Sequence, residues 1–379
     1  MGSVFETLGV RPVINASGVY TDLGGSRISP EVWTAMTEMN ERWVRMPDLL
    51  DRSGEILASR VGAEAARVTP GAAAAIMLGI AACMTGEDGK GWEQLPDTSG
   101  LRDEVVIQSG HRYKYDRQAW MTGARRMEIG TVDGTDPDEL REVLTDQTAA
   151  ILHPGHLDGS GGTLPLEAVA EIARARDVPI FVDAAYLNYP TSVMRTFIAR
   201  GADLVCFSAK YFGGPNAGGF VAGRRDLLRA IAGIDFTRYE SGEFRTYGRP
   251  LKLDRQIVAG VVLALDAWLS MDHEARFASY EARVDEIGRR VGEVPGVSYR
   301  PMFFTMDERL VEPQPTNCLV VDLEPTGERS VEDVAMRLAD GEPSIVCVVE
   351  AGRLVLAVDA LNDEEARIAG DRLRAVLTG

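Results

Sequence analysis

Residues 204–219 read LVCFSAKYFGGPNAGG, an apolar run followed by a lysine and then by a glycine-rich segment. Four consecutive apolar residues bounded in this way predict a short strand buried on both faces, with Lys210 just beyond its carboxyl end. A second apolar run, VPIFV at 178–182, directly precedes Asp183. Lys210 therefore follows Asp183 by 27 residues (210 − 183), and we expect both at strand ends of one sheet.

The chain around these two runs alternates short apolar segments with helical patterns. Strands are predicted at 105–107, 148–152 and 219–222, and a helix at 166–175. Continuous apolar strands that alternate with helices indicate the α/β class, with a mostly parallel sheet covered on both faces. After a break at 248–250, apolar residues at helical spacing predict a long helix over 252–269 that leaves the large domain.

The pattern changes beyond Met271. A charged helix is predicted at 275–291, short strands near 318–322 and 344–349, and a last helix at 363–377. We expect this region, 271–379, to form a smaller α+β C-terminal domain. Residues 31–270 would form the large domain, and residues 1–30 an N-terminal segment near a subunit interface.

The composition excludes several classes of protein. The 379 residues carry a formal net charge of −17, which argues against a nucleic-acid partner because phosphate binding needs clustered Lys and Arg. Four dispersed cysteines form no disulfide framework and suggest a reducing compartment. The first residues lack a signal-peptide pattern, and the longest apolar stretch is too short to span a bilayer. We expect a cytoplasmic protein without a membrane partner.

Asp183 and Lys210 together suit one kind of chemistry. A carboxylate at the end of a parallel strand points into the crevice where α/β folds bind ligands. A buried lysine there has a lowered pKa, as imine formation with an aldehyde cofactor requires, and the glycines at 213–219 let the backbone approach closely. Taken alone, each residue has a plain alternative, a surface lysine or a helix-capping aspartate.

Two further features fit the same cofactor, pyridoxal 5'-phosphate (PLP). Residues 69–74, TPGAAA, open a helix whose bare N–H groups could bind a phosphate, although a tightly packed helix start is the alternative. His111 follows a strand and could stack on a flat ring, although a lone His is more often structural. His153 and His156 are too few for a zinc site, so we expect no metal, but they could line the pocket.

Six stretches carry a family resemblance. They are INASGVYTDLGGS at 14–26, GAEAARVTPGAAAAI at 62–76, VIQSGHRYKYD at 106–116, HLDGSGGTLPLEAVAEIARARDVPIFVDAA at 156–185, FSAKYFGGPNAGG at 207–219 and GRPLKLDRQIVAG at 248–260. They resemble the selenocysteine synthase-like family of aspartate-aminotransferase-like (fold type I) PLP enzymes. The resemblance covers most of residues 10–270 and is weak after about 275.

The resemblance implies a role for several residues. Lys210 matches the Schiff-base lysine, and Asp183 matches the carboxylate that faces the pyridine nitrogen. Gly71, Ala72 and Ser208 match phosphate contacts, and His111 matches the ring-stacking position. The segment around residues 24–26 resembles the part that approaches the active site near a subunit interface, so a homodimer or higher homo-oligomer with shared active sites is implied.

Two branches of the family differ in substrate. The tRNA-dependent branch carries an extra N-terminal region, whereas this chain enters the core motif by residues 11–15. The stretch GHRYKYD is more similar to the D-glucosaminate-6-phosphate ammonia-lyase-like branch, which acts on small molecules. The chain departs from the family where residues 357–361, AVDAL, replace a strand resembling LLDPRTL, so that Asp359 stands where an arginine is expected.

The expected function is a PLP-dependent lyase for a small amino acid or amino sugar acid. Lys210 would remove the α-proton, and a β-substituent would then leave. Racemase, aldolase, β-replacement and aminotransferase chemistry stay open, as do a tRNA-dependent selenium transferase and a non-catalytic PLP-binding protein. Candidates for substrate recognition are Tyr20, Arg27, Arg112, Arg245 and Arg353, with Arg249, Tyr113 and Tyr186 as further possibilities.

Overall fold

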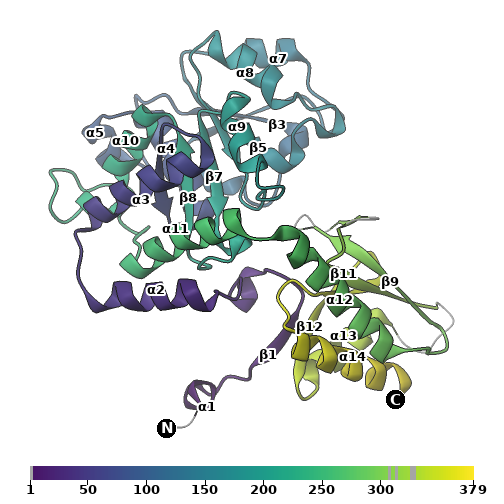
Figure 1. Ribbon diagram of the computed structural model, residues 1–379. Helices are drawn as coiled ribbons and strands as arrows, with labels where there is room; N and C mark the ends of the chain where they lie inside the picture. The colour runs from purple at the N-terminus through teal and green to yellow at the C-terminus, as the bar shows by residue number, and fades with distance from the viewer. Residues whose placement is uncertain (1–2, 306–308, 312–314, 325–329) are drawn as a thin grey trace. The chain divides into compact units, whose positions relative to one another are not determined.

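The structure is a computed structural model that describes residues 3–305, 309–311, 315–324 and 330–379. The chain divides into two compact units (Figure 1). One is continuous and comprises Arg27–Ser270, and the other combines Met1–Ser26 with Met271–Gly379. The clustering groups the N-terminal segment up to Ser26 with the C-terminal region, and the predicted boundary at residue 30 stays a prediction.

A seven-stranded sheet forms the centre of the unit Arg27–Ser270. Its order is β2-β8-β7-β6-β5-β3-β4, and the neighbours are parallel except for β8, which runs antiparallel to β2 and β7. The strands are β2 (Ala65–Thr69), β3 (Glu104–Gln108), β4 (Arg125–Ile129), β5 (Thr148–Pro154), β6 (Ile180–Asp183), β7 (Leu204–Ser208) and β8 (Gly219–Gly223). The predicted mostly parallel α/β sheet is confirmed.

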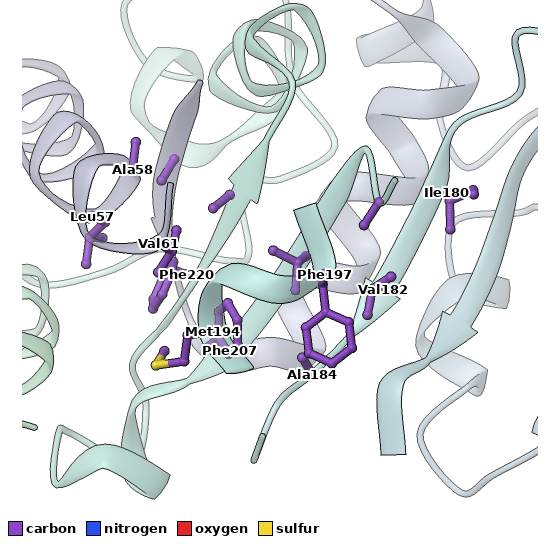
Figure 2. Close-up of a cluster of buried hydrophobic side chains, with 14 of the residues drawn as sticks. Leu57, Ala58, Val61, Ile180, Val182, Ala184, Met194, Phe197, Phe207 and Phe220 are labelled. Carbon is purple, nitrogen blue, oxygen red and sulfur yellow. The ribbon is translucent and has the colours of Figure 1, made fainter. Parts of the chain in front are cut away.

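Two hydrophobic clusters cover the two faces of this sheet. One contains Val182, Phe207 and Phe220, and Figure 2 shows them beside Phe197. Its helices are α2 (Pro30–Glu41), α3 (Met46–Val61), α7 (Pro137–Val143), α8 (Leu166–Arg174), α9 (Val193–Ala199) and α11 (Arg255–Ser270). The other cluster lies against α4 (Gly71–Thr85), α6 (Arg117–Trp120) and α10 (Arg225–Ile234), near α5 (Gly89–Gln94). Burial on both faces explains why the strands are continuous apolar runs.

In helices α4 and α11, the local sequence determines how the helix is buried and where it begins. Almost every residue of α4 is apolar and most are buried, so this helix is apolar all round rather than amphipathic. Helix α11 begins at Arg255, three residues later than we expected from the sequence (255 − 252). The carbonyl of Asp254 accepts from the N–H groups of Ile257 and Val258, so the first turn forms only there.

The second unit has a six-stranded sheet with the order β1-β12-β13-β11-β9-β10. Its strands are β1 (Val13–Ala16), β9 (Val297–Phe304), β10 (Leu310–Val311), β11 (Cys318–Leu323), β12 (Ser344–Glu350) and β13 (Arg353–Ala357), and its helices are α1 (Val4–Leu8), α12 (His273–Val291), α13 (Val331–Asp340) and α14 (Asp363–Thr378). β1 pairs in parallel with β12, with Val13 opposite Ser344. The N-terminal strand is therefore one edge of this sheet.

Across the described ranges of the chain, no helix combines the length and the apolar character that a membrane crossing needs.

Candidate active site

The register of the large sheet brings the predicted site residues together where its central strands β6 and β7 end. We call this end of the strands the site edge of the sheet. Asp183 of β6 pairs with Cys206 of β7. Two residues further along β7, Ser208 pairs with Gly219 of β8, which also pairs with Thr69 at the end of β2. Because side chains alternate along a strand, Asp183, Cys206 and Ser208 point to the same face, which is the one covered by α4.

Asp183 is a buried carboxylate with several hydrogen-bond donors around it. Its side chain is only 4% exposed. Oδ1 accepts from the N–H of Ala185 at 3.0 Å and from the thiol of Cys206 at 3.6 Å. Oδ2 accepts from the hydroxyl of Tyr113 at 2.5 Å. These donors compensate a charge that burial would otherwise make costly.

Lys210 lies two residues beyond Ser208, in the 3-10 turn η5 (Ala209–Phe212). It is 8% exposed, so the alternative of a surface lysine does not apply. Its Nζ lies 4.8 Å from the ring centroid of Tyr211. The turn ends at Gly213, whose φ of 77° requires the left-handed conformation that glycine adopts easily.

A row of aromatic rings connects the surroundings of Asp183 with those of Lys210. The ring of Tyr113 lies 5.3 Å from that of His156, which lies 5.5 Å from that of Tyr186. Tyr186 in turn lies 6.0 Å from Tyr211. These four residues, which we call the aromatic row, are partly exposed and offer flat surfaces at the strand ends.

The start of helix α4 offers backbone donors at the same edge. Its N-cap residue, Pro70, provides no side-chain hydrogen bond, so the first N–H groups are not capped by a side chain. A Cβ on Gly219 would lie 2.8 Å from the carbonyl carbon of Gly71, so only glycine lets β8 approach the helix this closely. Ser208 lies across β8 from this helix start and is 7% exposed. Uncapped donors beside a hydroxyl fit a phosphate group.

His111, for which we predict stacking on a cofactor ring, lies in a buried cluster of polar side chains. It is fully buried, and its ring lies edge-on to His153 at 4.7 Å. Its Nδ1 faces the amide of Gln108 at 3.3 Å, and its Nε2 faces the carbonyl of Leu157 at 3.1 Å. Burial, with the neighbouring His153, lowers the pKa of His111 to about 3, so it is neutral. Its stacking role stays a prediction that these contacts do not support.

His153 belongs to the same buried network. Its Nε2 contacts Oδ1 of Asp158 at 3.0 Å, and Oδ2 of Asp158 accepts from Arg200 at 2.5 Å. Burial opposes ionisation of Asp158, but the hydrogen bonds from His153 and Arg200 outweigh it and lower the pKa of this carboxyl. The N–H of Leu166 also donates to Asp158. The network thus fixes the loop between β5 and α8, which carries His156.

The arginines proposed for substrate recognition already have partners. Arg112 forms ion pairs with Asp116 and, at 2.6 Å, with Glu128. Arg249 pairs with Glu240 at 2.9 Å. The Nη1 of Arg245 donates to the carbonyl of Tyr239 at 3.4 Å. The charges of Arg112 and Arg249 are thus largely compensated, and substrate binding by any of the three stays a prediction.

Three other candidates belong elsewhere in the chain. Arg353 lies on β13 of the second unit, where it pairs with Asp322 at 3.1 Å. Tyr20 packs against a small core of that unit. Arg27 is exposed at the beginning of the large unit. Their part in substrate binding also stays a prediction.

Asp359, which stands where the family resemblance places an arginine, is an unusual carboxylate. Its Oδ1 is buried and has no hydrogen-bond partner among the described residues. The carboxylate oxygens lie 3.4 and 3.6 Å from the position that a Cβ on Gly18 would take. Burial raises the pKa of Asp359 to about 6.

Together, these features define a class of protein. Asp183 and Lys210 lie on neighbouring strand ends, an uncapped helix start lies beside Ser208, and aromatic rings line the same edge. This arrangement is that of the large domain of a fold type I PLP enzyme. Residues 13–276 match the sequence model of the L-seryl-tRNA selenium transferase family (SelA). The chain belongs to that family.

Two curated relatives are similar over most of the chain. The 5'-C-glycyluridine monooxygenase-decarboxylase of a Streptomyces species is 31% identical over 307 residues, 78% of this chain and 73% of that protein. The D-glucosaminate-6-phosphate ammonia lyase of Salmonella typhimurium is 28% identical over 301 residues, 78% of this chain and 77% of that protein. One is named a lyase and the other a decarboxylase, which supports the prediction of a lyase-type enzyme.

Solved structures agree with this assignment. The structure of a D-glucosaminate-6-phosphate ammonia-lyase superposes with a TM-score of 0.85 at 25% identity, covering 100% of this chain and 99% of that chain. A Thermus thermophilus aspartate aminotransferase matches with a TM-score of 0.51 at 18% identity, covering 99% of both chains. The predicted fold type I architecture and PLP cofactor are confirmed.

Sequence reasoning missed several residues of this site. Tyr113 stays a candidate for substrate recognition, and the hydrogen bond from its hydroxyl to Asp183 is not predicted from the sequence. Cys206 was seen only as part of a strand, although its thiol contacts the same carboxylate. The spacing of Asp183 and Cys206 on two predicted strand ends could have suggested that contact, whereas nothing in the local sequence indicates the tyrosine.

Proposed function

We propose that this chain is a PLP-dependent lyase that acts on a small amino acid or amino sugar acid by removing the α-proton and eliminating a β-substituent. The observation that carries the proposal is the buried pair Asp183 and Lys210 at the ends of two adjacent strands. The similarity to an ammonia lyase over 77% of that protein's length supports this reaction type.

The residues divide the work of holding the cofactor. Asp183 would face the pyridine nitrogen, and Lys210 would hold the aldehyde carbon through its amine. The N–H groups of Gly71 and Ala72, with the hydroxyl of Ser208, would bind the phosphate. When bound, PLP supplies an electron sink for the charge that forms at the substrate's α-carbon.

Lys210 would be the base that removes the α-proton of the substrate. Lys210 is 8% exposed, so bulk water has little access to its amine. The aromatic row would exclude water around this amine and offer a flat surface for the cofactor ring. His156 and Tyr113 are the members of the row nearest to Asp183 along the chain of ring contacts.

The test is the variant Lys210→Ala, and the control is Lys90→Ala, which changes an exposed lysine of helix α5. Wild-type protein and the control, incubated with PLP, should gain a visible absorbance band that survives dialysis. Lys210→Ala should lose the band and release ammonia from amino acids at least about 100-fold more slowly. A wild-type protein that gains no band would contradict the proposal.

A substrate panel would identify the reaction. We propose L- and D-amino acids and amino sugar acids, with ammonia and oxo acid as the products to assay. Release of ammonia supports elimination, whereas isomerisation without ammonia would indicate a racemase. A shift of labelled seryl-tRNA in a low-salt gel would indicate the tRNA-dependent alternative, which the charge of −17 disfavours.

A second candidate function is the decarboxylation of an α-amino acid with consumption of O₂. The observation that favours it is the 31% identity to an enzyme named a monooxygenase-decarboxylase. Both reactions begin from the same bound amino acid, so the residues that hold PLP do not separate them. An oxygen electrode with the same substrate panel does, because elimination consumes no O₂.

The assembly and the location are proposed on similar grounds. We propose a cytoplasmic homodimer or larger homo-oligomer with shared active sites. Helix α1 exposes Val4 at 62%, Phe5 at 47% and Leu8 at 68%, which is apolar surface that a second copy would cover. Light scattering after size exclusion should give at least twice the 41.2 kDa of one chain.

A further inference from the structure

We propose that Tyr113 stands in for the cofactor in the cofactor-free protein, by giving Asp183 a hydrogen bond like the one that the ring nitrogen of a bound cofactor would provide. The inference rests on the proposed function, because it assigns the ring nitrogen to Asp183. It concerns a residue outside the lysine and carboxylate pair, and it predicts how easily the protein takes up PLP.

The environment of Asp183 supports the first part of the argument. At 4% exposure, the carboxylate has almost no access to solvent water. Oδ1 has two protein donors, Ala185 N–H and the Cys206 thiol. Oδ2 has one described donor, the hydroxyl of Tyr113. Without that hydroxyl, a buried carboxylate oxygen would be left unsatisfied, which is strongly destabilising.

Tyr113 is suited to be a permanent donor. Burial and the charge of Asp183 raise the pKa of Tyr113 well above its usual value of 10. The phenol therefore keeps its proton throughout the neutral range, and an ionised carboxylate can only accept from it. The direction of the hydrogen bond is thus fixed.

The surrounding loop holds the ring in place. The ring of Tyr113 packs between those of His156 and Tyr115, at 5.3 and 6.2 Å. Its carbonyl accepts from the N–H of Asp116 at 3.2 Å, and the side chain of Asp116 pairs with Arg112. The hydroxyl is therefore aimed at Asp183 by the loop fold rather than by the carboxylate alone.

Donors that share one carboxylate weaken each other. A protonated ring nitrogen is the second donor that the cofactor would bring to Asp183. Each donor draws charge from the carboxylate and limits the approach of the other, so the bond to Tyr113 opposes cofactor binding. The hydrogen bond from Tyr113 therefore stabilises the cofactor-free protein and lowers its affinity for the cofactor.

The variant Tyr113→Phe tests this exchange, with Tyr115→Phe as a matched control that removes an exposed phenol from the same loop. Thermal unfolding is measured with and without PLP, and the PLP dissociation constant is measured from the absorbance change. We expect Tyr113→Phe to unfold at a lower temperature without PLP, and to bind PLP about 10-fold more tightly than wild type. The control should match wild type in both measurements.

The outcomes distinguish a tyrosine that replaces the cofactor's hydrogen bond from one that only stabilises the fold. If Tyr113→Phe loses equal stability with and without PLP, or binds PLP no more tightly than wild type, the proposal is wrong. If the variant folds only when PLP is added, that asymmetry supports it. In the background of Asp183→Asn, the effect of Tyr113→Phe on PLP affinity should vanish, and a persisting effect would contradict the proposal.

Failure of the proposed function looks different. In that case wild-type protein would show neither a PLP-dependent absorbance band nor stabilisation by PLP. A wild type that binds PLP, together with a Tyr113→Phe variant that binds it equally or more weakly, would overturn only the inference about Tyr113.

Discussion

At the scale of single residues, the site consists of a few buried polar groups whose partners come from distant parts of the chain. Tyr113 donates to Asp183, 70 residues further along the chain. Cys206 reaches the same carboxylate from a neighbouring strand. The chemistry at this carboxylate is therefore set by tertiary contacts, although each residue type is ordinary.

Asp359 should make the stability of the second unit depend on pH. Its pKa is raised by burial from the usual 3.8 to about 6, so the folded state holds this proton more tightly than the unfolded state does. Its contribution to stability is greatest below about pH 4, falls as the pH rises to about 6, and is constant above. Asp359→Asn should therefore gain stability relative to wild type between pH 4 and pH 7, by up to about 3 kcal/mol.

Urea unfolding of the two proteins at several pH values tests this expectation. The difference between Asp359→Asn and wild type should grow between about pH 4 and pH 6 and then level off. The exposed Asp340, in the same unit, gives the control variant Asp340→Asn. A difference for Asp359→Asn that is constant from pH 4 to pH 7 would mean that the carboxylate is not buried as described.

Some of the site could be predicted from the sequence and some could not. The positions of Asp183 and Lys210 can be predicted because each closely follows a short apolar run that forms a strand. The carboxyl ends of neighbouring parallel strands lie close together. The stacking role of His111 stays a prediction from its position after a strand. Its full burial against His153 could not be foreseen, because it depends on how the loop after β5 folds back over β3.

At the scale of the elements, close backbone approach matters more than side-chain identity. Strand β8 lies next to the first turn of α4, and glycine at position 219 permits this contact. The strands near 105, 148, 204 and 219 were predictable because burial on both faces makes them continuous apolar runs. The 3-10 turns that carry His111 and Lys210 have no such periodic signal.

Gly219→Ala and Gly71→Ala should differ in their effect on PLP binding. A Cβ at 219 would lie 2.6 Å from the carbonyl oxygen of Phe207 and 2.8 Å from Gly71, so β8 and the start of α4 must separate. A Cβ at 71 meets nothing within 4 Å and adds only the strain of a φ of 77°, about 1–2 kcal/mol.

We therefore expect Gly219→Ala to weaken PLP binding more than Gly71→Ala does, because it displaces the proposed phosphate donors. Equilibrium dialysis with PLP and thermal unfolding measure the two effects separately. Equal PLP affinities for the two variants would show that the contact between β8 and α4 does not shape the phosphate site.

At the scale of the whole molecule, a strand near the N-terminus pairs with a strand from the C-terminal region of the chain. Strand β1 pairs with β12, and Ile14 is 8% exposed in the core that these strands share with α14. A four-residue strand carries too little periodicity to reveal a partner more than 300 residues away. The division of the chain into residues 1–30, 31–270 and 271–379 therefore stays a prediction from local patterns.

Ile14→Ala should destabilise the second unit by about 2–4 kcal/mol, because it removes buried methyl groups from that core. Hydrogen exchange measured by mass spectrometry should show lost protection in β12 and β13, with that of β6 and β7 unchanged. Val13→Ala, a change at a half-exposed position of the same strand, is the control. Equal loss of protection in both units would show that they do not unfold separately.

The pairing of β1 with β12 also has a consequence for synthesis on the ribosome. Ala16 and Ser344 are separated by 328 positions (344 − 16), so the first strand is made long before its neighbour exists. The continuous unit Arg27–Ser270 is complete by then and can fold during translation. The nascent β1 must therefore keep an unpaired backbone edge throughout that time, and such an edge can pair with another chain.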